Sequence, residues 1–364
     1  MNEISSIPAD QRMKTYLVKI ATGPKMSKDL TELEAADGLR MILNGEVSQV
    51  RSALFLIAAR MKLETVAENI GYWRALDDTT VKQSVSLPCL LQVADAFDGF
   101  NRVPYFGFYA LPVLAAMGLP AYGHSTLPLP PKFGITFEDL LVNHYRVAAE
   151  QPFEKRKELI EKFKFGYLST RQSHPPLESL RDLRVEIVKR PMLATLEKML
   201  LPLQAEKNYL ATNYFHPGYE VSMLAVAKLS KFDSVAIGNG MEGGTLFGVH
   251  KQGKVFVESG GEQVAEKKLD YESLYDSATA RQIGDAFKAL KKIPATRESL
   301  AQLGEQALQD GTGPAAPMIA HQAGTLCHLF GILPDLPTAT ATAWKILNKG
   351  TCQNQLMQYV QACR

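Results

Sequence analysis

The chain has 364 residues, of which 46% are hydrophobic and 21% charged, and its formal net charge is +2. This balance excludes general disorder, and the near-neutral charge gives no whole-protein field for nucleic acid or an anionic membrane. Four cysteines, at positions 89, 327, 352 and 363, are too scattered to suggest a zinc site or a disulfide framework. The N-terminus lacks the apolar core of a signal peptide, and no apolar run approaches the length of a membrane span. We therefore expect a soluble cytoplasmic protein.

Helical patterns dominate the first part of the chain. Residues 1–29 are polar, and we expect them to form a loosely packed N-terminal lead-in. The segments 31–34 and 65–68 both read T-x-x-E, the spacing of a capping box, and Ser48 is a suitable N-cap for a helix between them. Three short helices are therefore predicted in residues 30–78, which we interpret as a small helical bundle domain.

Residues 79–364 are expected to form a larger α/β ligand-binding domain. In the segment 94–140, a turn, an apolar helix, a short strand and a proline-braced loop follow one another. Polar residues and glycines recur where these elements end, and ligands bind at such ends in open α/β sheets. The candidate anion-binding residues of this segment are Asp98, Gly99, Asn101, Arg102, His124, Lys132 and Gly134. Each has a plain alternative, such as a buried, satisfied role for His124 and simple exposure for Lys132.

Strands are also expected at 208–215 and 234–238, and the second leads into the sequence GNGMEGGT. Residues 247–258 alternate about Gln252-Gly253 and predict a hairpin. Residues 270–309 are expected to be helical.

Several parts of the chain resemble the anthranilate phosphoribosyltransferase and pyrimidine nucleoside phosphorylase superfamily, glycosyl transferase family 3. The first is the N-terminal helical segment, with its turn at 45–48 and its Arg-Met-Lys end at 60–62. The second is the 94–140 segment, in which Gly118, His124 and Gly134 keep the family's order. The resemblance implies a helical bundle completed by helices from about 155–185, a central mixed sheet flanked by helices, and a homodimer formed through the bundle.

The resemblance also implies a magnesium-dependent phosphate site, from which this chain departs. The glycine-rich turn is reduced to Asp98-Gly99, and Gly123 replaces the lysine before the histidine. Aligned through Glu242, the family's Asp-Glu metal pair becomes Thr245-Leu246. Leucine cannot ligate Mg²⁺, which requires oxygen ligands. Glu242 is left either to hold one ion through water or to cap local N–H groups.

Arginines after His174-Pro175 are the remaining candidates. Counted from that dipeptide, Arg184 falls on the family arginine that contacts the carboxylate of the aromatic acid, and Arg190 falls on a second family arginine. A guanidinium fork suits bidentate carboxylate recognition. The alternative for Arg184 is a surface arginine in a run of mixed charge.

Two functions follow from these observations. The first is a glycosyltransferase or phosphoribosyltransferase-type protein that binds a phosphorylated sugar or similar anion between its domains, at an altered phosphoribosyl pyrophosphate (PRPP) site. The second is a non-catalytic, dimeric relative that binds nucleic acid. A continuous basic groove between protomers would favour the second function, and a positive spot confined to a pocket would favour the first.

Overall fold

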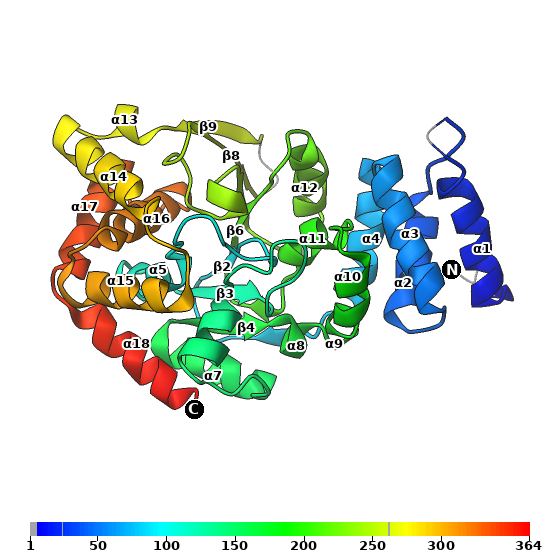
Figure 1. Cartoon of the computed structure of the whole chain (residues 1–364), viewed down its shortest axis with the longest axis horizontal. Coiled ribbons are helices and arrows are strands. Elements are labelled where there is room, and N and C mark those ends of the chain that lie inside the picture. Colours follow the sequence, from blue (N-terminus) through cyan, green and yellow to red (C-terminus); the bar gives the residue numbers. More distant parts are fainter. Residues whose placement is uncertain (1–5, 24, 261–262) are drawn as a thin grey trace.

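The structure is a computed structural model that describes residues 6–23, 25–260 and 263–364. A helical bundle forms one end of the molecule, and the C-terminal helices lie at the other end, beyond the central sheet (Figure 1). This arrangement confirms the predicted fold class, a small helical domain joined to a larger α/β domain. Among the described residues, no helix has the length and apolar character needed to cross a membrane.

The bundle contains the predicted helices and one more. Its helices are α1 (Ala9–Ile20), α2 (Glu32–Leu43), α3 (Gln49–Lys62) and α4 (Val66–Thr79). Both predicted capping boxes are present, at the starts of α2 and α4, and the Ser48 side chain caps α3.

The predicted lead-in is not loosely packed over residues 9–20. Helix α1 buries Met13, Tyr16 and Ile20 in the bundle core, because these apolar residues recur at helical spacing and share one face. Residues 1–5 and 24 of the predicted lead-in lie outside the described residues.

The central sheet of the described residues has seven strands in the order β4-β3-β2-β6-β7-β8-β9. Their bounds are β2 (Leu90–Ala94), β3 (Ala121–Ser125), β4 (Phe165–Ser169), β6 (Asn208–Asn213), β7 (Ser234–Gly238), β8 (Gly253–Ser259) and β9 (Ala265–Leu269). The strands from β4 to β7 in this order are parallel, whereas β8 and β9 pair antiparallel, so the sheet is mixed as expected. A separate parallel pair joins β1 (Gln83–Ser84) to β5 (Leu203–Gln204).

The predicted hairpin over residues 247–258 is wrong. Residues 247–252 are not a strand, and β8 pairs with β7 and β9 instead. The alternation has another cause: Phe247 and Val249 point into the core from a loop, and the Phe247 ring covers Gly238.

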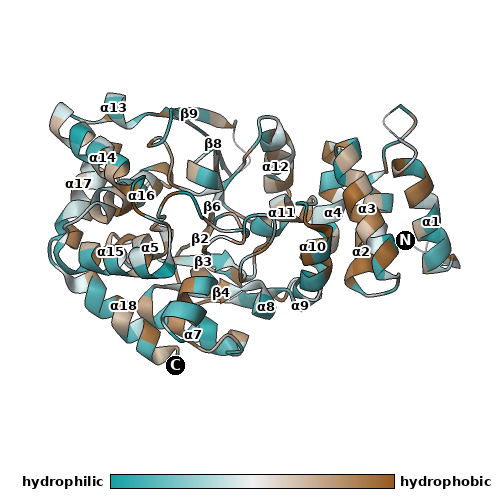
Figure 2. Ribbon diagram, viewed as in Figure 1, coloured by the Kyte–Doolittle hydropathy of each residue, from teal (hydrophilic) through white to brown (hydrophobic). Residues whose placement is uncertain are grey.

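The large domain carries helices on both faces of its sheet. Their bounds are α5 (Gly107–Ala116), α6 (Phe137–Asp139), η2 (Leu140–His144), α7 (Phe153–Phe163), α8 (Thr170–Ser173), α9 (Pro175–Glu178), α10 (Arg181–Ile187), α11 (Leu193–Leu196), η3 (Glu197–Met199), α12 (Tyr219–Ala227), η4 (Met241–Gly243), α13 (Tyr271–Leu274), α14 (Ser277–Leu290), α15 (Arg297–Asp310), α16 (Ala315–Leu329), α17 (Leu336–Leu347) and α18 (Thr351–Ala362). Teal, hydrophilic segments are prominent in α14, α15 and α18, whereas brown, hydrophobic segments are prominent in α2 and α3 of the bundle (Figure 2).

Two large apolar cores meet at the sheet. One contains α5 and the C-terminal helices, and the other joins the bundle to α9–α12 and to residues of β6 and β7. Leu177, Leu180 and Leu183 belong to the bundle core, whereas α7 packs against β4 and α18. The helices that complete the bundle therefore begin near residue 175 rather than 155.

The chain reverses its direction of travel across the sheet at β2. After β2 it builds β3 and β4 on one side, and then crosses to β6 and β7 on the other. Ligands in open α/β sheets bind outside the carboxyl ends of the strands at such a switch point. Residues that follow β2, β6 and β7 line the cleft described next.

Candidate functional site

A cleft lies between the helical bundle and the carboxyl ends of the central strands. Its space, counted out to the open solvent, is about 810 Å³. Arg60 and Glu64 of the bundle form one side, and residues 96–98 and 190–198 form others. A second hollow, which we call the cleft mouth, shares part of this lining. The cleft mouth is lined by Arg60, Arg102, Pro131, Lys132, Lys189, Arg190, Phe215 and Glu242.

The Glu242 carboxylate accepts hydrogen bonds from the backbone N–H groups beside the cleft mouth. Its Oε1 accepts hydrogen bonds from the backbone N–H groups of Arg102 and Val103, both at 3.0 Å. Its Oε2 accepts one from the N–H of Asn101 at 3.3 Å. Three successive N–H groups that converge in this way suit an oxyanion, and here the oxyanion is a carboxylate of the chain itself.

Asp98 forms ion pairs with two of the nearby cationic side chains. Lys132 Nζ lies 3.4 Å from Asp98 Oδ1 and donates to the backbone oxygen of Glu242 at 3.2 Å. The Arg190 guanidinium forms an ion pair with the other oxygen of Asp98. Burial lowers the pKa of the Lys132 ammonium, against the opposing attraction of Asp98 and Glu242.

Arg184 also has an internal partner. It lines the cleft, but its two Nη atoms lie 2.6 and 3.0 Å from the carboxylate oxygens of Glu197. Both side chains are buried, and burial raises the pKa of Glu197 while Arg184 opposes the shift. The guanidinium fork predicted to hold a ligand carboxylate therefore holds Glu197.

Gly99 and Gly134 let two backbone segments approach closely. Gly99 has φ +73°, and a Cβ on it would lie 2.3 Å from the Gly134 oxygen. A Cβ on Gly134 would lie 2.5 Å from the Phe100 nitrogen. The Asn101 side chain strengthens the same junction by donating to the Lys132 oxygen at 3.2 Å. These three residues position the loops of the cleft mouth.

His124 lies apart from the cleft. It is buried in β3, where its Nε2 lies 3.0 Å from the Ser173 hydroxyl, and it borders only a small cavity beside Asp95. Burial and the neighbouring His174 lower the pKa of His124 to about 3. The structure thus gathers Asp98, Arg102, Lys132 and Glu242 at one place and separates His124 from them.

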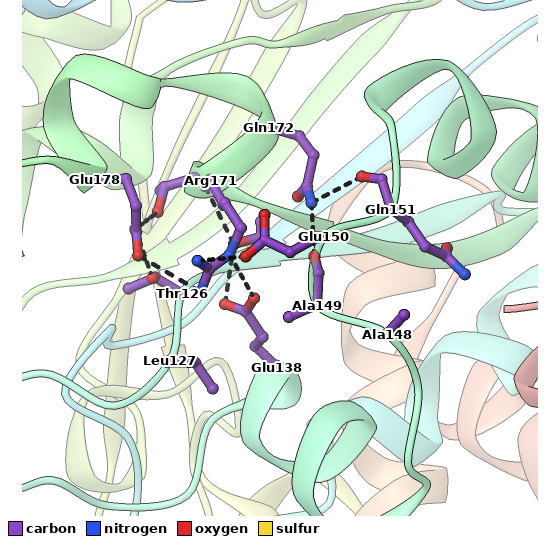
Figure 3. A network of polar contacts seen from close by, with 12 residues as sticks. Thr126, Leu127, Glu138, Ala148, Ala149, Glu150, Gln151, Arg171, Gln172 and Glu178 are labelled. Atoms are coloured by element: carbon purple, nitrogen blue, oxygen red, sulfur yellow. Dashed lines mark hydrogen bonds and ion pairs between the residues drawn. The ribbon is translucent and has the colours of Figure 1, made fainter. Parts of the chain in front are cut away.

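The ends of β3 and β4 are closed by a polar network centred on Arg171 (Figure 3). Arg171 lies 2.9 Å from Glu150 and 3.8 Å from both Glu138 and Glu178. Glu178 also accepts from the Thr126 hydroxyl at 2.9 Å. Arg171 is thus surrounded by carboxylates of the chain itself, although its Nε has no hydrogen-bond partner among the described residues.

Several cleft residues were not among the predicted site residues. Arg60 and Lys189 line the cleft mouth. Lys198 and Asn213 line the main cleft, at what we call its inner end. Asn213 carried a weak signal, since it is a polar residue two positions before the end of the strand predicted at 208–215. Lys198 carried none, because it lies within the apolar run LEKMLLPL.

Comparisons with known proteins assign this architecture. Residues 14–80 match the model of the glycosyl transferase family, helical bundle domain. Anthranilate phosphoribosyltransferase from Thermus thermophilus is 27% identical over 338 residues, which cover 92% of this chain and 96% of that protein. This chain is anthranilate phosphoribosyltransferase-like over most of its length, and its bundle resembles the helical bundle domain of that glycosyl transferase family. An uncharacterized protein of Aquifex aeolicus is 28% identical over 283 residues, 74% of this chain and 82% of that protein.

Solved structures of the family share the fold. The crystal structure of the Thermus thermophilus anthranilate phosphoribosyltransferase superposes with a TM-score of 0.74 at 24% identity, covering 98% of this chain and 100% of that chain. The Saccharomyces cerevisiae enzyme in complex with PRPP and Mg gives a TM-score of 0.77 at 14% identity, covering 96% of this chain and 97% of that chain.

The residues of this chain do not fit a magnesium site of the family's Asp-Glu type. Thr245 is buried, and its backbone N–H donates to Asp95 while its hydroxyl contacts Tyr105 and Gln322. Leu246 is buried in the core. Glu242 has both carboxylate oxygens engaged by N–H groups. No step of the chemistry is therefore assigned to a metal.

Proposed function

We propose that this protein binds a phosphorylated sugar or a similar anion at the cleft mouth, in a PRPP site altered so that binding does not depend on magnesium. The observation that carries the proposal is the charge of the cleft mouth. Five cationic side chains, those of Arg60, Arg102, Lys132, Lys189 and Arg190, line it together with one carboxylate, that of Glu242. Cations gathered in a concave site attract phosphate groups strongly.

Two of these cations are free to meet a ligand. Within the described part of the chain, the side chains of Arg102 and Lys189 are exposed and make no hydrogen bond or ion pair. Val188, beside Lys189, has φ +60°, and Glu242 has φ +50°, conformations that are strained for side-chain-bearing residues and often concentrate at functional sites. These features support a ligand role for the cleft mouth.

Catalysis of ordinary phosphoribosyl transfer finds little support in this geometry. Departure of pyrophosphate requires its developing charge to be neutralised by metal, cations and N–H groups. Here Glu242 occupies the N–H groups, and Asp98 pairs with Lys132 and Arg190. We therefore propose ligand binding as the primary function and leave the acceptor unassigned.

Calorimetric titration of PRPP tests this proposal directly. We expect binding of the same strength with Mg²⁺ and with EDTA, and a loss of about tenfold in affinity for Arg102→Ala, because one charge-assisted contact is removed. Lys288→Ala, which alters an exposed lysine on α14, is the matched control and should bind normally. Binding that requires Mg²⁺, or no binding at all, would overturn the proposal.

A second candidate function is the binding of single-stranded nucleic acid. Phe215 and Phe133 are 51% and 55% exposed, and the Arg190 guanidinium lies 5.7 Å from the centre of the Phe215 ring. Exposed rings beside cations are typical of surfaces on which bases stack. Fluorescence anisotropy of a labelled oligonucleotide across a salt series would separate the two functions. Tight, salt-dependent binding that PRPP does not displace would favour nucleic acid.

We also propose that the protein forms a homodimer through its bundle. On α3, Val50 and Met61 are 78% and 75% exposed, Leu54 is 47% exposed, and Ile57 is half-buried between them. These positions recur at helical spacing and form one apolar face, which suits a second helix.

A further inference from the structure

Residues 126–134, between β3 and α6, form a loop that borders both the main cleft and the cleft mouth. We call it the β3–α6 loop. Leu129 and Pro130 line the main cleft, and Pro131 and Lys132 line the cleft mouth. Lys132 is one of the five cations on which the proposed function depends. The position of its ammonium therefore depends on how the backbone of the β3–α6 loop is held.

On the cleft side, backbone hydrogen bonds hold the later half of this loop. The N–H of Leu129 donates to the Phe97 oxygen at 3.2 Å, and the N–H of Gly134 donates to the Asp98 oxygen at 2.8 Å. Within the loop, the N–H of Phe133 donates to the Leu129 oxygen at 3.1 Å. These three amides report whether the loop keeps its place.

On the outer side, the first half of the loop is held by Arg181, at the start of α10. Arg181 Nη2 donates to the Thr126 hydroxyl and, at 3.0 Å, to the Leu127 backbone oxygen. Its Nη1 donates to the Pro128 backbone oxygen at 3.2 Å. Within the described part of the chain, no other group donates to the Leu127 or Pro128 oxygen. The hydrogen bonds of these two carbonyl groups to the rest of the domain therefore depend on Arg181.

The Arg181 guanidinium is itself held by Glu178. Arg181 Nε donates to Glu178 Oε1 at 2.9 Å, and Glu178 Oε2 accepts from the hydroxyls of Thr126 and Thr170 at 2.9 and 2.7 Å. The contact between Thr126 and Glu178 is visible in Figure 3. All three guanidinium nitrogens thus have acceptors, in a planar arrangement that a lysine ammonium cannot reproduce.

We propose that Arg181 is a positioning residue that holds the β3–α6 loop in its ligand-binding position before a ligand is bound. Arg181 lines neither the main cleft nor the cleft mouth, so it acts through the loop and not by contact with the ligand. A loop that spends only part of its time in the binding position lowers the apparent affinity by that fraction. The effect on affinity rests on the proposed function, whereas the effect on the loop requires no ligand.

Hydrogen exchange of the loop amides tests the proposal without a ligand. Arg181→Gln removes the charge and most of the contacts, and Arg181→Lys keeps the charge but loses the planar fork. In both variants we expect the amides of residues 129–134 to exchange at least about tenfold faster, while the amides of β3 keep their rates and show that the sheet is folded. Arg40→Lys, which alters an ion pair with Asp78 on the bundle, is the matched control.

Unchanged exchange of residues 129–134 in folded Arg181→Gln protein would overturn the proposal. If Arg181→Gln did not fold, the more conservative Arg181→Lys would give the same test.

Calorimetric titration of PRPP measures the consequence at the cleft mouth. Arg181→Lys should weaken PRPP binding by about tenfold, and saturating PRPP should restore slow exchange to the loop of this variant. Restoration by ligand separates a loop that has lost its position from general damage to the fold. In a Lys132→Ala background, Arg181→Lys should cause a further loss of less than about twofold, because both changes act through the same ammonium. A full tenfold loss in both backgrounds would contradict action through Lys132.

The proposed function and the role of Arg181 can fail separately. If the unaltered protein did not bind PRPP, the proposed function would fail, and faster exchange in the Arg181 variants would still support the hold on the loop. If PRPP bound to the unaltered protein and to Arg181→Lys with equal affinity, the proposed function would stand and Arg181 would not be a positioning residue of the site.

Discussion

Arg184 and Glu197 form a bidentate ion pair in which both side chains are buried. Removing one member of such a pair leaves a charge without a partner in a low-dielectric environment, which is more damaging than removing both. The pair therefore acts as a structural element of the inner cleft, since it holds α10 against η3.

The contribution of this ion pair to stability can be measured as the change in the free energy of unfolding of single variants. Glu197→Ala should lower the free energy of unfolding by about 3–5 kcal/mol, whereas Asp285→Ala, which breaks the exposed pair with Lys288, should change it by less than about 1 kcal/mol. Urea denaturation followed by circular dichroism would give both values. A similar small change in the two variants would show that Arg184 finds another partner.

At the residue scale, the sequence predicted several residues of the cleft mouth correctly but placed His124 wrongly among them. Asp98, Arg102, Lys132 and Glu242 were all candidates, and they meet at the cleft mouth because turns at strand ends converge there. His124 was a candidate on the same grounds, but its ring packs edge-on against Phe97 and borders a separate small cavity rather than the cleft. Side-chain direction at a strand end depends on packing that no local pattern encodes.

At the scale of elements, the exposed apolar face of α3 is the feature with the clearest consequence. Leu54→Asp would place a carboxylate in the middle of this face, where a partner helix would have to desolvate it. We expect this variant to be a folded monomer and the unaltered protein to be a dimer. Light scattering after gel filtration would measure both masses, with Leu229→Asp, exposed outside the bundle, as the control. An unaltered protein that is already monomeric would rule out the proposed dimer.

Local signals predicted helices more reliably than strands. The capping boxes of α2 and α4 are complete within four residues, so their sequences contain the whole interaction. The alternation in 247–258 reflected instead a loop that buries Phe247 and Val249 against distant elements. Strand β7 was predicted at its observed bounds because a short apolar run, residues 235–237, ends there at Gly238.

At the scale of the whole molecule, the fold retains a ligand cleft while its anion-binding groups are engaged by carboxylates of the same chain. Glu242 fills the N–H groups of residues 101–103, Asp98 pairs with Lys132 and Arg190, and Glu197 fills the fork of Arg184. The near-neutral total charge gives no sign of this arrangement. Composition alone cannot distinguish the mainly cationic cleft mouth from the cleft itself, which is lined by as many acidic as cationic side chains. The resemblance to the family indicated the architecture and the altered metal pair, but not that Asp98 and Glu197 pair with the cations of the cleft.

Whether the Glu242 carboxylate fills an anion site can be measured directly. Calorimetry without metal would compare pyrophosphate binding to the unaltered protein and to Glu242→Gly. Glycine suits the positive φ of position 242, and it frees three backbone N–H groups for the ligand. We predict that the variant binds pyrophosphate at least about tenfold more tightly, while Glu242→Gln, which keeps an accepting oxygen, gains less. Equal or weaker binding by folded Glu242→Gly would contradict the claim that the carboxylate occupies an anion site.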